Sequence, residues 1–165
     1  MWDAPYVAAH SLSVMHNKES ALNTTNMTGL EIMRAMEKEM IPYPSMTETI
    51  PMKFITVEKG KIVFDVKADN RHLNVFGGVH GGFAAAVLDT ATGCAVHSML
   101  SAGTGYATID LSIKMLKPVP KDVCLLAEGK IINISKSLGV SEGTLKDEAG
   151  KLYAHATATC MLLVT

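Results

Sequence analysis

The fold of this chain is restricted most by a long apolar segment near its middle, HGGFAAAVLDTATGCAVH at residues 80–97. The segment has the length of a helix and is apolar on nearly all sides, so most of its surface must be buried. Segments with strand-like patterns surround it, two before it and four after it. They are residues 49–58, 61–67, 107–116, 123–134, 138–145 and 152–163. A single curved antiparallel sheet wrapped around the helix would bury it, so we expect an α+β fold of this kind.

The residues before the first strand differ in pattern from the rest of the chain. Thr28 and Glu31 have the spacing of a capping box, which predicts that a helix begins there. The Ile41-Pro42 pair is expected to stop that helix. We therefore divide the chain into an N-terminal extension with one helix, residues 1–46, and a single domain, residues 47–165.

Composition excludes several classes of partner. Of the 165 residues, 48% are hydrophobic and 19% are charged, and the formal net charge is −1. This balance favours neither nucleic acid nor an anionic membrane as a partner, and no apolar run reaches the ~18 residues of a membrane span. The high apolar content instead predicts that some surface is buried against another subunit.

Location follows from the cysteines and the first residues. Cys94, Cys124 and Cys160 are odd in number and far apart, so we expect reduced, buried thiols. The first ten residues lack the basic region of a secretory signal, and we expect a cytoplasmic protein.

A single carboxylate interrupts the apolar helix. From His72 through Ile113 the only Asp, Glu, Lys or Arg residues are Asp89 and Asp110. Burial of an unpaired carboxylate costs several kcal/mol, so Asp89 needs a reason to be there. It could bond a neighbouring hydroxyl such as that of Thr92, or lie on an exposed stripe of the helix. Alternatively, it lies in a partly dry cleft, where it serves as a catalytic base or nucleophile.

Two glycines open the same helix. Glycine disfavours a helix by about 1 kcal/mol relative to alanine, so the pair Gly81-Gly82 also needs a reason. Glycines can simply form a tight turn into the helix. They can also leave the free N–H groups of a helix N-terminus accessible to an oxyanion.

Taken together, Asn74, Gly77, His80-Gly81-Gly82 and Asp89 have a spacing that resembles the signature of a known family. It is that of hotdog-fold acyl-CoA thioesterases, in particular the PaaI-like group of phenylacetate degradation. The resemblance covers residues 47–164 and implies the hotdog fold, in which a curved antiparallel sheet wraps around one long central helix.

The resemblance also implies roles for the residues near the helix. Asp89 corresponds to the carboxylate that activates water or attacks the thioester carbonyl, and Gly81 to the residue whose N–H polarises that carbonyl. Asn74 and His80 correspond to residues that orient the substrate or the glycine loop. Thr108 stands where many relatives place a serine that helps to hold the water.

The remaining implied contacts are with the substrate. Gly82 is expected to contact it at the helix N-terminus, and Lys136 and Ser137 occupy the turn that touches the coenzyme A phosphates in related enzymes. The resemblance implies no cofactor other than coenzyme A, which is part of the substrate. His80 and Asp89 lack the further ligands of a zinc site, so we expect no metal.

Spacing alone argues for a site shared between subunits. Gly81 and Asp89 are eight residues apart, roughly 12 Å along one helix. A base must come within ~3 Å of the atoms that it serves, directly or through one water. One helix cannot easily offer both groups to one carbonyl, whereas two antiparallel copies can. We expect a homodimer with a two-fold axis, and pairs of dimers that form a homotetramer.

The expected function is therefore hydrolysis of an acyl-CoA to a carboxylic acid and free coenzyme A. The alternatives are a hotdog dehydratase acting on a hydroxyacyl chain, a non-catalytic acyl-CoA-binding protein, and a purely structural member. The small residues 84–86 leave room for a phenyl or a short aliphatic acyl group, so the sequence leaves the acyl group open.

Overall fold

The computed structural model describes residues 24–164 of the chain. A 3-10 turn, η2 (Thr24–Asn26), is followed by helices α1 (Gly29–Glu37) and α2 (Met46–Thr49). Strands β1 (Met52–Glu58) and β2 (Lys61–Lys67), the 3-10 turn η3 (Asn70–His72) and the long helix α3 (Gly81–His97) come next. The chain ends with strands β3 (Thr104–Met115), β4 (Cys124–Ile134), β5 (Leu138–Lys146) and β6 (Leu152–Val164). Residues 1–23 of the predicted extension lie outside the described residues.

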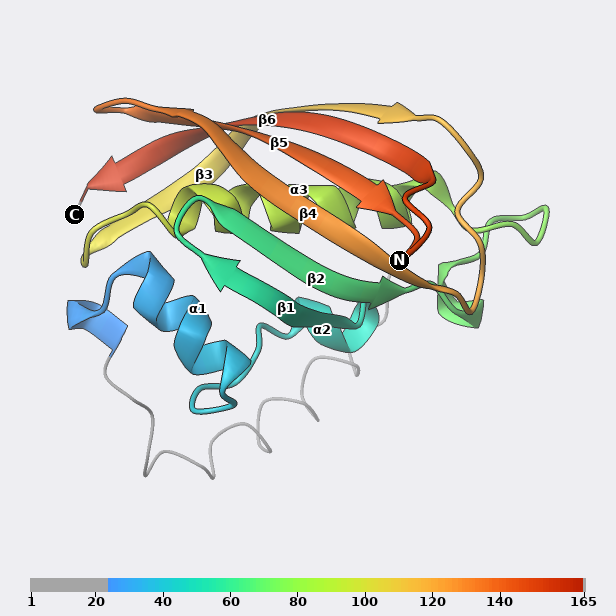
Figure 1. Ribbon diagram of the computed structural model, residues 1–165, viewed down its shortest axis with the longest axis horizontal. Helices are drawn as coiled ribbons and strands as arrows, with labels where there is room; N and C mark the ends of the chain where they lie inside the picture. Colours follow the sequence, from blue (N-terminus) through green and yellow to red (C-terminus); the bar gives the residue numbers. More distant parts are fainter. Residues whose placement is uncertain (1–23, 165) are drawn as a thin grey trace, which may run out of the picture.

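All six strands form one antiparallel sheet in the order β1-β2-β4-β5-β6-β3. The sheet curves around α3, and α1 and α2 lie near β1 on the side that the sheet leaves open (Figure 1). This architecture confirms the predicted hotdog fold. Within residues 24–164, no helix is long and apolar enough to cross a membrane.

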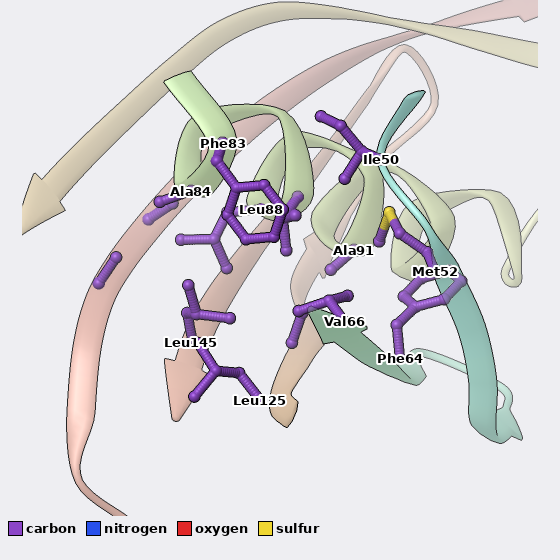
Figure 2. Close-up of a cluster of buried hydrophobic side chains, with 14 of the residues drawn as sticks. Ile50, Met52, Phe64, Val66, Phe83, Ala84, Leu88, Ala91, Leu125 and Leu145 are labelled. Atoms are coloured by element: carbon purple, nitrogen blue, oxygen red, sulfur yellow. The ribbon is translucent and has the colours of Figure 1, made fainter. Parts of the chain in front are cut away.

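The hydrophobic core lies between α3 and the concave face of the sheet, where β2, β4 and β5 contribute buried side chains. Leu88 and Ala91 of α3 are fully buried, and Leu88 lies on the side of Leu145 and Leu125 while Ala91 lies beside Val66 (Figure 2). The helix approaches the sheet so closely that a Cβ on Gly129 would overlap the Ala91 carbonyl. Burial on this side therefore accounts for the apolar composition of the helix.

The predicted capping box is present, and a glycine makes the turn between the first two strands. At the start of α1, the Thr28 N–H donates to Glu31 Oε2 at 2.7 Å and the Glu31 N–H donates to Thr28 Oγ1 at 3.3 Å, which completes the capping box. Gly60 joins β1 to β2 with a φ of +78°, a conformation that favours glycine. The Pro42 signal was less accurate, because α1 already ends at Glu37.

Other features differ from expectation. The short helix α2 and the turn η3 were not predicted, because elements of three or four residues carry no measurable period. Cys124 was expected to be buried and is exposed, since it is the first residue of β4, at the end of its pairing with β2. Cys160 is buried and Cys94 is half-buried.

Candidate active site

The N-terminus of α3 is capped by a histidine. His80 is the N-cap residue, and its Nδ1 accepts a hydrogen bond from the Gly82 N–H at 2.8 Å. A Cβ on Gly82 would lie 2.9 Å from that same Nδ1. Glycine at this position therefore allows the imidazole ring to fold back and cap the helix. His80 and Gly82 are exposed. Because the Gly82 N–H already donates to His80, the predicted contact of Gly82 with substrate would use its exposed backbone surface and not its N–H.

Gly81 is the first residue of α3 and keeps its N–H free. This N–H donates no hydrogen bond to any group within residues 24–164. It lies at the positive end of the helix dipole, which favours a negatively charged ligand. A Cβ on Gly81 would lie 2.7 Å from Met115 Sδ, so the glycine also makes room for that side chain. Gly81 lines a cavity of about 290 Å³ together with Met115 and Tyr153.

Asn74 organises the loop that leads to this helix. Its Oδ1 accepts hydrogen bonds from the N–H groups of Phe76 at 2.9 Å and Gly78 at 3.3 Å. Its own N–H donates to the Gly78 carbonyl at 2.8 Å, and Gly77 has a φ of +79°. The side chain thus fixes a tight loop just before His80, which agrees with the predicted role of orienting the glycine loop.

Asp89 lies in the middle of α3, and its Oδ1 is buried without a hydrogen-bond partner in the described part of the chain. The Thr92 hydroxyl does not serve it, because Thr92 Oγ1 donates to the carbonyls of Leu88 at 2.7 Å and Asp89 at 3.1 Å. Asp89 as a whole is half-buried, but an exposed stripe does not account for Oδ1, which is inaccessible to solvent. Asp89 lines a second cavity of about 490 Å³.

Thr108 lines the same cavity as Asp89. It lies on β3, immediately before an irregularity in the pairing with β6, where Thr108 pairs with Cys160 and Asp110 with Thr159. Its hydroxyl is 3.8 Å from Cys160 Sγ. Bulges of this kind re-aim side chains and are frequent next to active sites. The structure thus brings Thr108 and Asp89 together, as a water-holding role requires.

Two groups in this cavity escaped the sequence analysis, Cys94 and Tyr106. Burial, aided by the charge of Asp89, raises the pKa of the Cys94 thiol to about 12. Burial is also the main cause that raises the pKa of the Tyr106 phenol. Both groups are therefore neutral at neutral pH. The sequence signal that could have located Tyr106 is Gly93, a glycine inside the helix. A Cβ at Gly93 would lie 2.8 Å from the Tyr106 ring and hydroxyl.

His97 closes the other end of the helix, and its ring packs 5.4 Å from that of Tyr106. At the C-terminus of a helix the dipole favours a cation. Burial instead lowers the pKa of His97, because the ring is partly removed from water.

The predicted coenzyme A contacts lie near the opposite end of α3 from Gly81. Lys136 and Ser137 are exposed in the β4–β5 turn, where the Ser137 carbonyl accepts from the Leu162 N–H at 2.9 Å. Gly139, two residues further on, packs against Val96 near the C-terminus of α3. Within one protomer, therefore, these residues do not meet the glycine loop.

Comparison with known proteins relates part of the chain to a known family. Residues 76–154 match the thioesterase superfamily. This part of the chain is therefore similar to members of that superfamily. A phenylacetic acid degradation-related protein of Ralstonia eutropha has 29% identity and a TM-score of 0.71, with 78% of this chain and 97% of that chain covered. A thioesterase of Streptococcus pneumoniae, solved with coenzyme A, has 25% identity and a TM-score of 0.62, with 67% and 87% covered. A protein of Halobacterium salinarum that is named as an esterase has 41% identity over 83 residues, which are 49% of this chain and 54% of that protein.

The match to the thioesterase superfamily agrees with the predicted family, and thioester hydrolase is the enzyme class that we expected. The roles of the individual site residues remain predictions. Within residues 24–164, no three His, Cys, Asp or Glu side chains gather as the ligands of a metal would.

Proposed function

We propose that this chain hydrolyses acyl-CoA thioesters, with Asp89 as general base or nucleophile. The observation that carries the proposal is the Asp89 carboxylate, whose Oδ1 is buried without a partner in the described chain and whose side chain lines a cavity of about 490 Å³. Such a group costs several kcal/mol of stability, so its presence is best explained by chemistry. The coenzyme A bound to the Streptococcus pneumoniae relative supports the same class of substrate.

The proposed reaction uses only water and the thioester. As a general base, Asp89 takes a proton from water while the water oxygen bonds to the carbonyl carbon. The carbonyl oxygen becomes an oxyanion, which accepts a hydrogen bond from the free N–H of Gly81. The carbon–sulfur bond then breaks, the thiolate of coenzyme A takes up the proton, and the carboxylic acid is released. As a nucleophile, Asp89 would first form an anhydride with the acyl group, which water then hydrolyses.

The other site residues support these two groups. We propose that His80 and Asn74 hold the loop and the helix N-terminus in the geometry that presents the Gly81 N–H. Thr108 is the candidate to hold the attacking water, because its hydroxyl lines the same cavity as Asp89. Gly82, Lys136 and Ser137 remain proposed contacts of the coenzyme A moiety.

The site would be completed by a second subunit. Gly81 and Asp89 line different cavities of one protomer, and eight residues of helix separate them by roughly 12 Å. In an antiparallel two-fold dimer, the N-terminus of one α3 lies beside the middle of the other. The loop before α3 supports such a contact, because Val75 and Phe76 at its tip are 93% and 94% exposed. Apolar side chains so exposed are typical of a surface that a partner covers.

The test is a thiol-release assay over aryl, short and medium acyl-CoA esters. We expect free coenzyme A to appear with wild-type protein and to fall by about 10²–10⁴ in kcat for Asp89→Asn. Release of thiol at an unchanged rate from Asp89→Asn would remove the assignment of Asp89. Conversion of an added 3-hydroxyacyl-CoA to an enoyl-CoA and water, without thiol release, would instead establish the dehydratase. Binding of acyl-CoA with neither product would establish the non-catalytic binding protein.

A further inference from the structure

The cavity of Asp89 has a wall that lies outside the sheet. Strands β1 and β2 form one side of it, and α3 with β3 forms another. The remaining wall comes from the described part of the N-terminal extension. Its members are Met33, Met36, Tyr43, Pro44 and Met46. Since β1 and β3 are the two edges of the curved sheet, the extension covers the gap between those edges (Figure 1).

This wall is anchored to the rest of the fold at both ends. At the start of α1, the Gly29 N–H donates to the Leu100 carbonyl at 3.2 Å, and Gly29 packs directly on the His97 carbonyl. Within α2, the Glu48 carbonyl accepts a hydrogen bond from Arg71 Nη1 at 2.8 Å. Between these points, Met33 is 1% exposed and belongs to the main hydrophobic core. The extension is therefore a fixed part of the cavity, and its side chains set the cavity's shape.

The chemistry of the lining selects for an uncharged ligand. No Lys or Arg lines this cavity among the described residues, and burial lowers the pKa of His97, the histidine in the lining, which favours its neutral form. Its acidic side chain, Asp89, would repel a carboxylate at the far end of an acyl group. The lining also contains methionine thioethers and three tilted aromatic rings, with Phe54 5.6 Å from Tyr43 and 4.5 Å from Phe64 between ring centroids. Methionine side chains are flexible and adapt to apolar groups of varied shape.

We propose that Met36, Tyr43 and Met46 of the extension determine acyl specificity, and that the substrates are CoA esters of extended, uncharged, apolar acyl groups. This inference rests on the proposed thioesterase function. A volume of about 490 Å³ corresponds to about sixteen water molecules at ~30 Å³ each, far more than an acetyl group could fill. Each added methylene buried in such a cavity favours binding by about fourfold, the equivalent of the transfer free energy of one CH₂.

Matched tryptophan variants test the wall. Met36→Trp and Met46→Trp add bulk at residues that line the cavity. Met40→Trp is the control, because Met40 belongs to the same extension and is about as exposed as Met46, 53% against 50%, but lies outside the lining. The measurement is the ratio of kcat/KM for decanoyl-CoA to that for butyryl-CoA. We expect Met36→Trp or Met46→Trp to lower this ratio by at least about tenfold, because the bulk displaces several methylenes, while Met40→Trp keeps the wild-type ratio.

A pair of substrates of equal carbon number tests the charge. Succinyl-CoA and butyryl-CoA both carry four acyl carbons, and only succinyl-CoA ends in a carboxylate. We expect kcat/KM for succinyl-CoA to be lower by at least about tenfold, because its charge would be buried unpaired beside Asp89. Equal rates for the two esters, or equal chain-length ratios in all four proteins, would overturn the proposal.

Failure of the proposed function gives a different result. If no acyl-CoA ester is hydrolysed, the thioesterase proposal falls, and the wall is then tested by equilibrium binding of decanoyl-CoA. Weaker binding to Met36→Trp and Met46→Trp than to Met40→Trp would support the acyl wall. Identical affinities of the three variants would overturn it.

Discussion

Replacing Gly81 by proline removes one hydrogen atom on which the proposed mechanism depends. Gly81 is the first residue of α3, the helical position at which proline is most readily accepted. The preceding residue, His80, has φ −66° and ψ 137°, which is the extended geometry that proline requires before it. The lost N–H has no partner within residues 24–164, so no structural hydrogen bond is broken.

The matched control is Gly81→Ala. Both variants add a Cβ that approaches Met115 Sδ to 2.7 Å, and only proline removes the N–H. Met115 is 54% exposed and flexible, so its side chain can move in either variant. The difference between the two variants therefore isolates the hydrogen-bond donor.

The expected magnitude is that of one oxyanion donor. We expect kcat of Gly81→Pro to be about 10²–10³ lower than that of Gly81→Ala, which is about 2.7–4 kcal/mol of transition-state stabilisation. The free energies of unfolding of the two variants should agree within about 1 kcal/mol. The assay is thiol release from a saturating acyl-CoA, with urea denaturation run in parallel. Equal kcat values in two folded variants would refute the assignment of the Gly81 N–H as oxyanion donor.

Three further predictions concern stability. Asp89→Asn should raise Tm or leave it unchanged, because a neutral amide removes the free-energy cost of burying a carboxylate. A clearly lower Tm would instead show that the carboxylate stabilises the fold. Gly29→Ala should lower the free energy of unfolding by about 1–3 kcal/mol, because the added Cβ would overlap the His97 carbonyl. The control is Gly105→Ala, whose Cβ would meet only ordinary van der Waals contacts. Equal urea midpoints for these two variants would contradict this packing. Burial lowers the pKa of His97, so the unfolded chain binds the proton more tightly and the free energy of unfolding should fall as pH drops below about 6.5, until the folded pKa is passed. Urea denaturation at pH 7.5 and 5.5 should show a smaller loss for His97→Gln than for wild type, and identical losses would refute the role of His97.

The parts of the fold that could be predicted are those encoded in local pattern. The capping box of Thr28 and Glu31, the turn at Gly60 and the apolar helix 80–97 each depend on residues a few positions apart. Such signals survive folding because tertiary packing reinforces them. The element order around the helix then restricts the sheet to few topologies.

The features that escaped prediction depend on contacts between distant residues. Tyr106 is ordinary as a strand residue, and only its packing against the interior of α3 brings it beside Cys94. The position of Met36 and Tyr43 over the cavity follows from the docking of the extension, which no period in the sequence encodes. The free Gly81 N–H was anticipated as a class of site, but the use of the Gly82 N–H by the His80 ring was not.

The claim that one active site draws on two subunits has a direct test in hybrid dimers. Asp89→Asn and Gly81→Pro subunits with different affinity tags are co-expressed, and the species that carries both tags is purified. In a shared site, each hybrid dimer has one site with both intact groups and one site with neither, so its kcat per dimer should reach about half of the wild-type value. Activity of the hybrid no greater than that of the two parent variants would contradict the shared site.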